Sequence, residues 1–538
     1  MKRCPTCQQT YTDETLKFCR DDGATLITDD SLQAESATQI LPSSHSGDQS
    51  HAQTLHNAKS ETTTSVLDVD KATAQTAGLK EPRPTSSAEQ HSTKRISPRR
   101  IGFALALIAL LLTVLVCGYW FSARRSANAT QIEAIAVLPF QNESGNAEME
   151  YLSDGMTESL ITSLSQLPKL NVKARSSVFR YKGKETSVQT IGKELSVQAV
   201  LTGRVIARGE DLALYVELVD AATENVLWKA DYKRQMANLA TLQSEIARDV
   251  ADKLKVKLSG ADEQRLAKNY TENADAYQLY LRGRFYTNKR TPKDSQKAIE
   301  YFNQAIAADP KYALAFASLA DAYSILSSFG GAPSHEAMPK AREAVLKALS
   351  LDNNLAEAHA ALGLILSSYD YDFAGAEREF RRAIELNPNY ATAHHYYAQL
   401  LNNLSRFEEA SAEYRRALEV DPLSLIINRH YGESLFFARR YDAGLAQLKK
   451  TVELDANFAS VYASLALLYQ VKGNYAESVE AQAREQELFG NTANAALIRE
   501  SFARGGWKEF LRVVTEAPEP ILSPWHNAAA FHAELGNK

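Results

Sequence analysis

Three cysteines near the start of the chain have the spacing of metal ligands. Cys4 and Cys7 form a Cys-x-x-Cys pair, and Cys19 is followed three residues later by Asp22. Two such pairs normally supply four thiolates to a tetrahedral zinc ion, and here a carboxylate takes the fourth place, although it is a harder ligand than a thiolate. We expect a structural zinc site at Cys4, Cys7, Cys19 and Asp22. A metal-free remnant and a redox role for Cys4 and Cys7 are the alternatives.

Residues 1–27, which carry this pattern, resemble a zinc ribbon. A module of this length can hardly bury a sufficient core, so a bound metal would have to stabilise it. No His or Glu general base accompanies the cysteines, which makes the expected zinc structural and not catalytic. The module carries the acidic residues Asp13, Glu14, Asp21 and Asp22, and the whole chain has a formal net charge of −5, so we expect no binding to nucleic acid.

The remaining chemistry-bearing motifs are incomplete. Gly183 and Lys184 lack the rest of a phosphate-binding loop, and no Ser–His–Asp set, kinase loop set or dinucleotide fingerprint is present. We therefore expect no enzyme activity, no cofactor beyond the zinc and no small-molecule substrate. The fourth cysteine, Cys117, is the last one in the sequence, so packing alone must hold everything after it.

A membrane anchor is predicted at residues 101–121 (IGFALALIALLLTVLVCGYWF), which carry no charge. As a helix this stretch would span about 31 Å, which matches a bilayer core of roughly 30 Å. More basic residues precede it than follow it, so the positive-inside rule puts the N-terminus in the cytoplasm and the larger C-terminal region in the periplasm or outside the cell. We expect a single-pass protein of the cell (inner) membrane. Residues 28–100 contain no aromatic residue and are predicted to be a disordered linker.

A repeat of 34 residues dominates the C-terminal part. Pro388, Pro422, Ala456 and Gly490 are each 34 residues apart, and each follows a small–x3–large–x2–small helical pattern. Small residues also recur where two helices would cross, at Gly283, Ala320, Gly363, Ala398, Gly432 and Ala466. This pattern resembles the tetratricopeptide repeat. It predicts six copies over residues 274–490, with a degenerate repeat and a capping helix at 491–538.

Residues 131–260 alternate strand-like and helix-like patterns in the order β-α-β-α-β-β-β-α, closed by a helix at 239–258, which predicts an α/β domain with a mixed sheet. The segments IAVLPFQNESGNAEMEYLSDGMTESLITSLSQL and VLTGRVIARGEDLALYVELVDAATENVLW resemble the TolB-like N-terminal domain. That domain precedes tetratricopeptide arrays in bacterial membrane proteins such as CadC-like regulators and cyclase- or kinase-linked sensors. The resemblance implies an envelope or sensory setting and no known chemistry.

The expected fold is thus multidomain: a small zinc-ribbon-like module, one transmembrane helix, an α/β TolB-like domain and an all-α tetratricopeptide-repeat solenoid. In the repeat family, certain first-helix positions line a concave groove that binds proteins. Carried over to this chain, those positions are Asp321, His395, Gln399, Asn402, Asn403, Arg429 and Glu433, and the alternative is that they are ordinary solvated residues.

Two functional hypotheses follow from these features. The first is a membrane-anchored scaffold or adaptor in envelope signalling or assembly, which binds protein partners through the groove. The second is a one-component transmembrane sensor or regulator that resembles CadC-like proteins but lacks their DNA-binding domain.

Overall fold

The computed structural model describes residues 2–3, 10–11, 27–28, 132–256, 258–517 and 521, and the chain divides into two compact units, Met1–Asn128 and Ala129–Lys538. In the described part of the first unit, three short strands form an antiparallel sheet in the order β2-β1-β3: β1 (Lys2–Arg3), β2 (Thr10–Tyr11) and β3 (Ile27–Thr28). The expected zinc ligands, the linker and the apolar span at 101–121 lie outside the described residues and stay predictions.

Two features are absent from the described residues. No helix among them combines the length and the apolar character that crossing a membrane requires. They also contain no group of three or more His, Cys, Asp or Glu side chains arranged to hold a metal ion.

The second unit begins with the predicted mixed sheet, which is confirmed. Over the described residues its order is β6-β4-β7-β8-β9, with β5 also paired to β7. The pairs that join β4, β5, β6 and β7 are parallel, whereas β7–β8 and β8–β9 are antiparallel. The strands are β4 (Ala134–Val137), β5 (Gln141–Asn142), β6 (Asn171–Val172), β7 (Ala199–Arg208), β8 (Asp211–Asp220) and β9 (Val226–Gln235).

Seven short or medium helices complete this region, and we call the part from β4 to α6 the α/β domain. They are η1 (Ala147–Met149), α3 (Glu150–Ser165), α4 (Arg175–Val178), η2 (Phe179–Tyr181), α5 (Val188–Leu195), η3 (Met236–Asn238) and α6 (Leu239–Lys253), all within the described residues. Helix α7 (Gly260–Ala267) leads from there to the repeats and starts with a capping box at Ser259 and Asp262.

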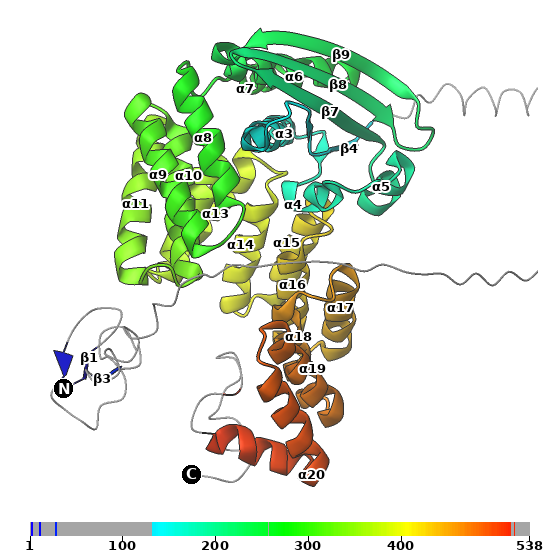
Figure 1. Cartoon of the computed structure of the whole chain (residues 1–538), viewed down its shortest axis with the longest axis vertical. Coiled ribbons are helices and arrows are strands. Elements are labelled where there is room, and N and C mark those ends of the chain that lie inside the picture. Colours follow the sequence, from blue (N-terminus) through cyan, green and yellow to red (C-terminus); the bar gives the residue numbers. More distant parts are fainter. Residues whose placement is uncertain are drawn as a thin grey trace, which may run out of the picture. The chain divides into compact units, whose positions relative to one another are not determined.

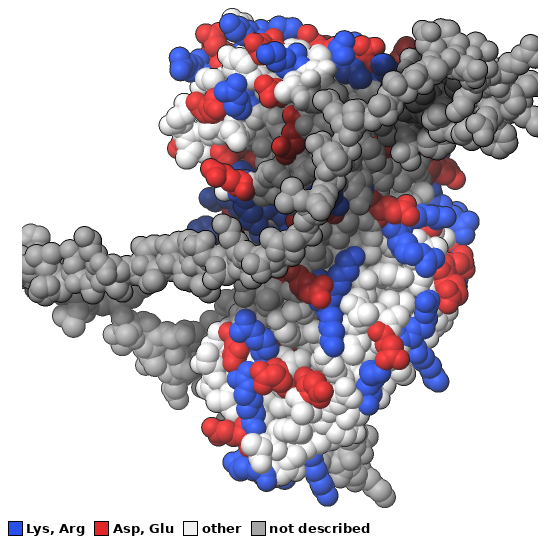
Figure 2. Space-filling view, turned by 90° about the vertical axis from the view of Figure 1, so that its right-hand side faces the viewer, with Lys and Arg blue, Asp and Glu red and all other residues white. Residues whose placement is uncertain are grey.

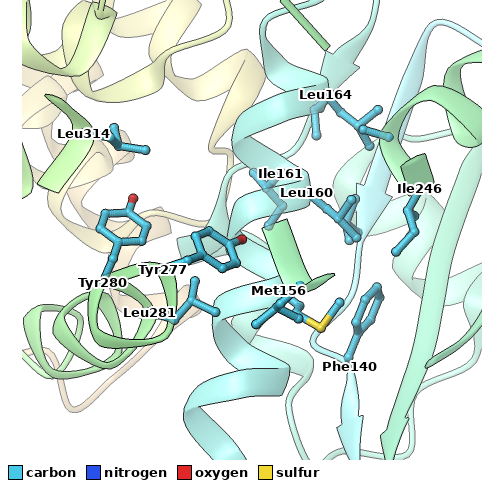
Figure 3. Packing of buried hydrophobic residues seen from close by; sticks show 14 of the residues in the cluster. Phe140, Met156, Leu160, Ile161, Leu164, Ile246, Tyr277, Tyr280, Leu281 and Leu314 are labelled. Atoms are coloured by element: carbon cyan, nitrogen blue, oxygen red, sulfur yellow. The ribbon is translucent and has the colours of Figure 1, made fainter. Parts of the chain in front are cut away.

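Helix α3 is buried on both of its faces, which explains why its sequence is apolar or small almost all the way round. One face packs on the sheet and α6, with Met156 and Leu160 at most 1% exposed. The other face packs on the first repeat, so closely that a Cβ atom at Gly155 would lie 2.9 Å from Leu281 Cδ2. Figure 3 shows Phe140 and Ile246 on one side of α3 and Tyr277, Tyr280 and Leu281 on the other.

The predicted all-α solenoid is also confirmed, as a succession of antiparallel helical pairs in the described residues (Figure 1). The first helices of the pairs are α8 (Ala274–Thr287), α10 (Ala313–Ser328), α12 (Ala356–Ser368), α14 (Ala391–Asn403), α16 (Leu425–Phe437) and α18 (Ala459–Val471). The second helices are α9 (Pro292–Ala308), α11 (Ser334–Leu351), α13 (Phe373–Leu386), α15 (Phe407–Val420), α17 (Tyr441–Leu454) and α19 (Tyr475–Leu488). Helix α20 (Thr492–Glu516) follows and is broken at Gly505 and Gly506.

The small residues of the repeat permit close helix crossings, as the sequence pattern predicts. A Cβ atom at Gly363 would lie 2.7 Å from the Phe380 ring, and one at Gly283 would lie 2.4 Å from the Phe302 ring. Both phenylalanines are completely buried. Each ring therefore fills the space that the missing side chain leaves, and this contact locks the two helices of a repeat together.

Candidate functional site

The concave side of the first three repeats faces the α/β domain and is not an open groove. Side chains from α8, α10 and α12 and side chains from α3 and α4 line a common cavity of about 370 Å³. Asp321, one of the predicted groove residues, is in this cavity. Its carboxylate makes no hydrogen bond or ion pair with any residue that the structure describes, and burial raises its pKa.

A buried ionic cluster joins the two parts beside this cavity. Glu158 on α3 accepts hydrogen bonds from Arg284 Nε at 3.0 Å and from Asn288 Nδ2 at 2.7 Å, and its Oε2 lies 3.3 Å from Arg175 Nε. Burial by itself would raise the pKa of Glu158, but the two arginines hold it below its usual value. The carboxylate is therefore ionised, and it neutralises two guanidinium groups inside the protein.

A second set of contacts fixes the α/β domain against the later repeats. Asn389 Nδ2 lies 3.0–3.1 Å from the carbonyl oxygens of Ser165, Leu167 and Leu170, at the end of α3 and just beyond it. Ser177 donates to Asp421 Oδ1 at 2.6 Å. We call this set, together with the Glu158 cluster, the domain–repeat interface. Its further members are the pairs Asn387–Ser165, Lys173–Glu419, Ala174–Val420, Ser176–Asp421, Arg180–Leu423 and Arg180–Leu454.

The other predicted groove residues lie beyond this interface, on α14 and α16. Four of them are brought together by a residue that the sequence analysis did not identify, His430. His395 Nε2 lies 2.8 Å from His430 Nδ1, and the Gln399 amide lies 2.7 Å from the same nitrogen. Arg429 lies 2.6 Å from the other ring nitrogen of His430 and 3.4 Å from Glu433.

The network continues to the last repeat and leaves some polar atoms unused. Ser464 on α18 donates to Glu433 Oε1 at 2.5 Å. Arg429 Nε and Asn402 Oδ1 are buried and have no hydrogen-bond partner among the described residues. Asn403 is exposed at the end of α14 and is not part of the network. A signal for His430 existed in the sequence, because it follows His395 by one repeat length plus one residue.

The proton positions in the histidine pair follow from Arg429. A guanidinium can only donate, so His430 Nε2 accepts and the proton of the neutral ring sits on Nδ1, directed toward His395 Nε2. The Gln399 amide beside Nδ1 must then present its oxygen, not its NH2 group, to this N–H. Burial, together with Arg290 and Arg429, lowers the pKa of His395 to about 3. Burial, His395 and Arg429 lower the pKa of His430 well below its usual value. The pair is therefore neutral near pH 7, where its ring nitrogens hydrogen-bond to the neighbouring Gln399 and Arg429 side chains.

Large apolar side chains are exposed beside this network. Phe437 at the end of α16 is 54% exposed, and Leu467 and Val471 on α18 are 38% and 46% exposed. All three continue the series of groove-lining positions along the first helices. The arrangement combines apolar contact area with polar groups fixed by the network, which suits binding of an extended peptide better than catalysis.

Glu158→Ala is expected to destabilise the second unit by about 3 kcal/mol, because it leaves Arg284 and Arg175 buried without their counter-charge. The free energy of unfolding of the full chain, measured by urea denaturation with circular dichroism, checks this. The matched control is Glu143→Ala, which removes the half-exposed pair with Arg204 and should change the value by less than about 1 kcal/mol. Equal losses in the two variants would contradict the ionic role of Glu158.

The histidine pair should make stability dependent on pH. Because the folded-state pKa of His395 lies below the usual 6.5, its contribution is fully present above about pH 6.5 and is lost as the pH falls toward 3. Between pH 7.5 and 5.0 the stability lost through His395 amounts to about 2 kcal/mol. His395→Gln should remove this amount from the pH dependence of the unfolding free energy. His335→Gln, at a side chain that is 62% exposed, is the control and should leave the pH dependence unchanged.

Family models match three segments of the chain. Residues 130–249 match the HilA/YgeH-like transcriptional regulator, second domain, and residues 279–312 and 379–410 match the tetratricopeptide repeat. The predicted repeats are thereby confirmed. The α/β domain matches a regulator domain under this description, while the TolB-like and zinc-ribbon resemblances stay predictions.

Relatives and solved structures resemble parts of the chain. It is 32% identical over 236 residues to "Putative adenylate cyclase 3" of Rhizobium meliloti. The matched region makes up 44% of this chain and 40% of that protein. It is 27% identical over 282 residues to "Transcriptional regulator HilA" of Salmonella typhimurium. The matched region makes up 51% of this chain and 48% of HilA. The chain thus spans less than half the length of either relative. Among solved structures, PilW, a type IV pilus biogenesis factor, aligns with this chain at 19% identity and a TM-score of 0.35. The alignment covers 42% of this chain and 98% of PilW. The chain carries tetratricopeptide repeats and a HilA-like regulator domain.

Proposed function

We propose that this protein is a membrane-anchored adaptor that binds a protein segment along the concave side of α14, α16 and α18. The observation that carries the proposal is the contrast between the two halves of the repeat array. The first half is covered by the α/β domain of the same chain, whereas in the second half Phe437, Leu467 and Val471 remain exposed beside a fixed polar network. Exposed apolar groups with a polar rim are typical of protein-binding surfaces.

The partner expected at this surface is an extended segment with spaced apolar side chains. Phe437 and Leu467 would provide the contact area that dominates binding energy at most interfaces. Asn403 and Gln399 would hydrogen-bond to the peptide backbone of the segment. Acidic and basic side chains are interspersed over the face in Figure 2 and are not sorted by sign, so charge alone does not select a strongly basic or acidic partner for that face.

The double variant Phe437→Ser, Leu467→Ser should reduce partner recovery at least about tenfold, because truncation of two central apolar contacts costs on the order of 1–3 kcal/mol or more. Tagged full chain is crosslinked in native membranes, and the recovered proteins are quantified against the wild type. Leu346→Ser is the matched control, since Leu346 is 51% exposed on α11, away from the groove. A partner set that survives the double variant, or that the control also removes, would count against binding at this surface.

The membrane anchor, the cytoplasmic N-terminus and the structural zinc site are part of the same proposal, and their support is the sequence alone. A reporter that is active only outside the cytoplasm should be active when fused after residue 538 and inactive when fused before residue 1. This outcome follows from the excess of basic residues ahead of residues 101–121. Activity at the N-terminal fusion alone would invert the orientation and place the repeats in the cytoplasm.

A sensor or regulator is the second candidate, and its support is the match of residues 130–249 to the HilA-like regulator domain. The two candidates differ in what the loss of the groove would do. Transcript profiles of a deletion strain, complemented either with the wild type or with the Phe437→Ser, Leu467→Ser variant, separate them. An adaptor of envelope assembly leaves these profiles unchanged, whereas a regulator alters a defined set of transcripts.

A further inference from the structure

Strand β9 forms a long edge of the sheet within the part of the chain that the structure describes. It is ten residues long, and among the described residues it pairs only with β8. In Figure 1 it is the outermost strand of the sheet on the side away from the repeats. An edge of this length presents a row of unpaired backbone N–H and C=O groups that a further strand can bind.

The pairing of β8 with β9 determines which backbone groups point outward. Met236 N donates to Glu210 O at 2.8 Å, and the register then continues with Leu212 opposite Arg234 and Val216 opposite Ala230. Because hydrogen-bonded pairs alternate with non-bonded pairs in an antiparallel ladder, the even-numbered residues of β9 bond to β8. Within the unshifted part of the register, the odd-numbered ones direct their N–H and C=O groups to the edge: Lys229, Asp231, Lys233 and Gln235. The Lys233 carbonyl oxygen there accepts a hydrogen bond from Arg234 Nη1 at 2.9 Å. Leu227 lies at the register shift between β8 and β9, where this alternation stops.

The side chains along this edge are complementary to a second copy of the same strand. Lys229 and Asp231 are exposed, and neither has an ion-pair partner among the described residues. If two β9 strands pair antiparallel about a two-fold axis at Ala230, Lys229 of each copy lies opposite Asp231 of the other. Both residues have edge-directed backbone groups, so they also exchange the hydrogen bonds of the ladder.

This register places further residues favourably. On the inner face, Trp228 of one copy lies opposite Tyr232 of the other, in a non-hydrogen-bonded pair where side chains approach most closely. Leu227, which is 47% exposed, lies at the register shift, so the regular pairing of this axis runs from Trp228 to Tyr232. A two-fold axis at Lys229 or at Asp231 would instead place like charges opposite each other. An axis at Tyr232 would pair Asp231 with Lys233, whose carbonyl oxygen already accepts a hydrogen bond from Arg234 Nη1 at 2.9 Å.

We propose that two copies of this chain associate through antiparallel β9–β9 pairing centred on Ala230, which joins their sheets into one continuous sheet. The partner is a second copy because the strand is complementary to itself in charge and in hydrogen-bonding groups. This dimer leaves the groove on α14, α16 and α18 free and does not depend on the adaptor function.

Charge-swap variants of the full chain test this, with sedimentation velocity in a mild detergent as the measurement. The wild type should sediment as a dimer. Lys229→Asp and Asp231→Lys should each raise the dimer dissociation constant at least about tenfold, because each turns two attractive pairs into repulsive ones. The double variant Lys229→Asp, Asp231→Lys should restore the dimer, since the pairs become attractive again with their signs exchanged.

Lys233→Glu is the matched control on the same strand. In the proposed register it lies beyond the regular pairs and has no charged residue opposite it, so dimerisation should stay within about threefold of the wild type. With an axis at Tyr232 it would face Asp231 and abolish the dimer. Unchanged far-ultraviolet circular dichroism of all variants shows that the fold is retained. A monomeric wild type, or a double variant that fails to recover, would overturn the proposal.

Discussion

The burial of α3 on two sides is the constraint on which the rest of the second unit depends. A helix that packs only on a sheet can keep one polar face, but α3 also packs on α8, and Gly155 allows the two helices to approach closely. Its remaining polar groups must then find partners inside the protein. Glu158 does so with Arg284 and Asn288, and Thr157 donates to Ser153 O and accepts from Phe140 N. The α/β domain and the first repeats consequently share one hydrophobic core.

That shared core divides the repeat array into two parts with different roles. In repeats one to three, the positions that normally line a binding groove carry residues such as Tyr280, Arg284 and Glu357, which face the α/β domain. In the later repeats the equivalent positions carry His395, Arg429 and Leu467, which the α/β domain does not cover. The early repeats thus support the domain, and the later ones retain the surface that repeat proteins use to contact other proteins.

The sequence predicted the elements better than it predicted their contacts. The 34-residue period and the alternating strands identify the solenoid and the mixed sheet, because both depend on local spacing that one chain displays. The expected helix at 239–258 ends earlier, at Lys253, because the backbone turns left-handed at Lys255, with φ of 55°. Short elements such as α4 and β5 carry too few residues to show a period.

The position of the predicted groove residues shows where such reasoning stops. Asp321 has the expected place on its helix, yet it faces a cavity, because the α/β domain contacts the repeats through pairs such as Glu158 and Arg284 that lie far apart in the sequence. A single sequence contains no sign of such pairing. The residues around His395 were each assigned from their own repeat as groove positions, without a link between them. Only the structure shows that His430 connects four of them.

The domain–repeat interface also bears on the order in which the chain can fold. Arg180 bonds to the carbonyl of Leu454, which follows it by 274 residues. At roughly 5–20 residues per second, a ribosome needs roughly 15–55 s to make the intervening chain. During that time the segment around Arg180 lacks its partners on the later repeats, whereas the outer face of α3 gains α8 once residues 274–287 are made. The α/β domain can therefore pack on the first repeat early, and its polar contacts with the later repeats, such as those of Arg180, must form last.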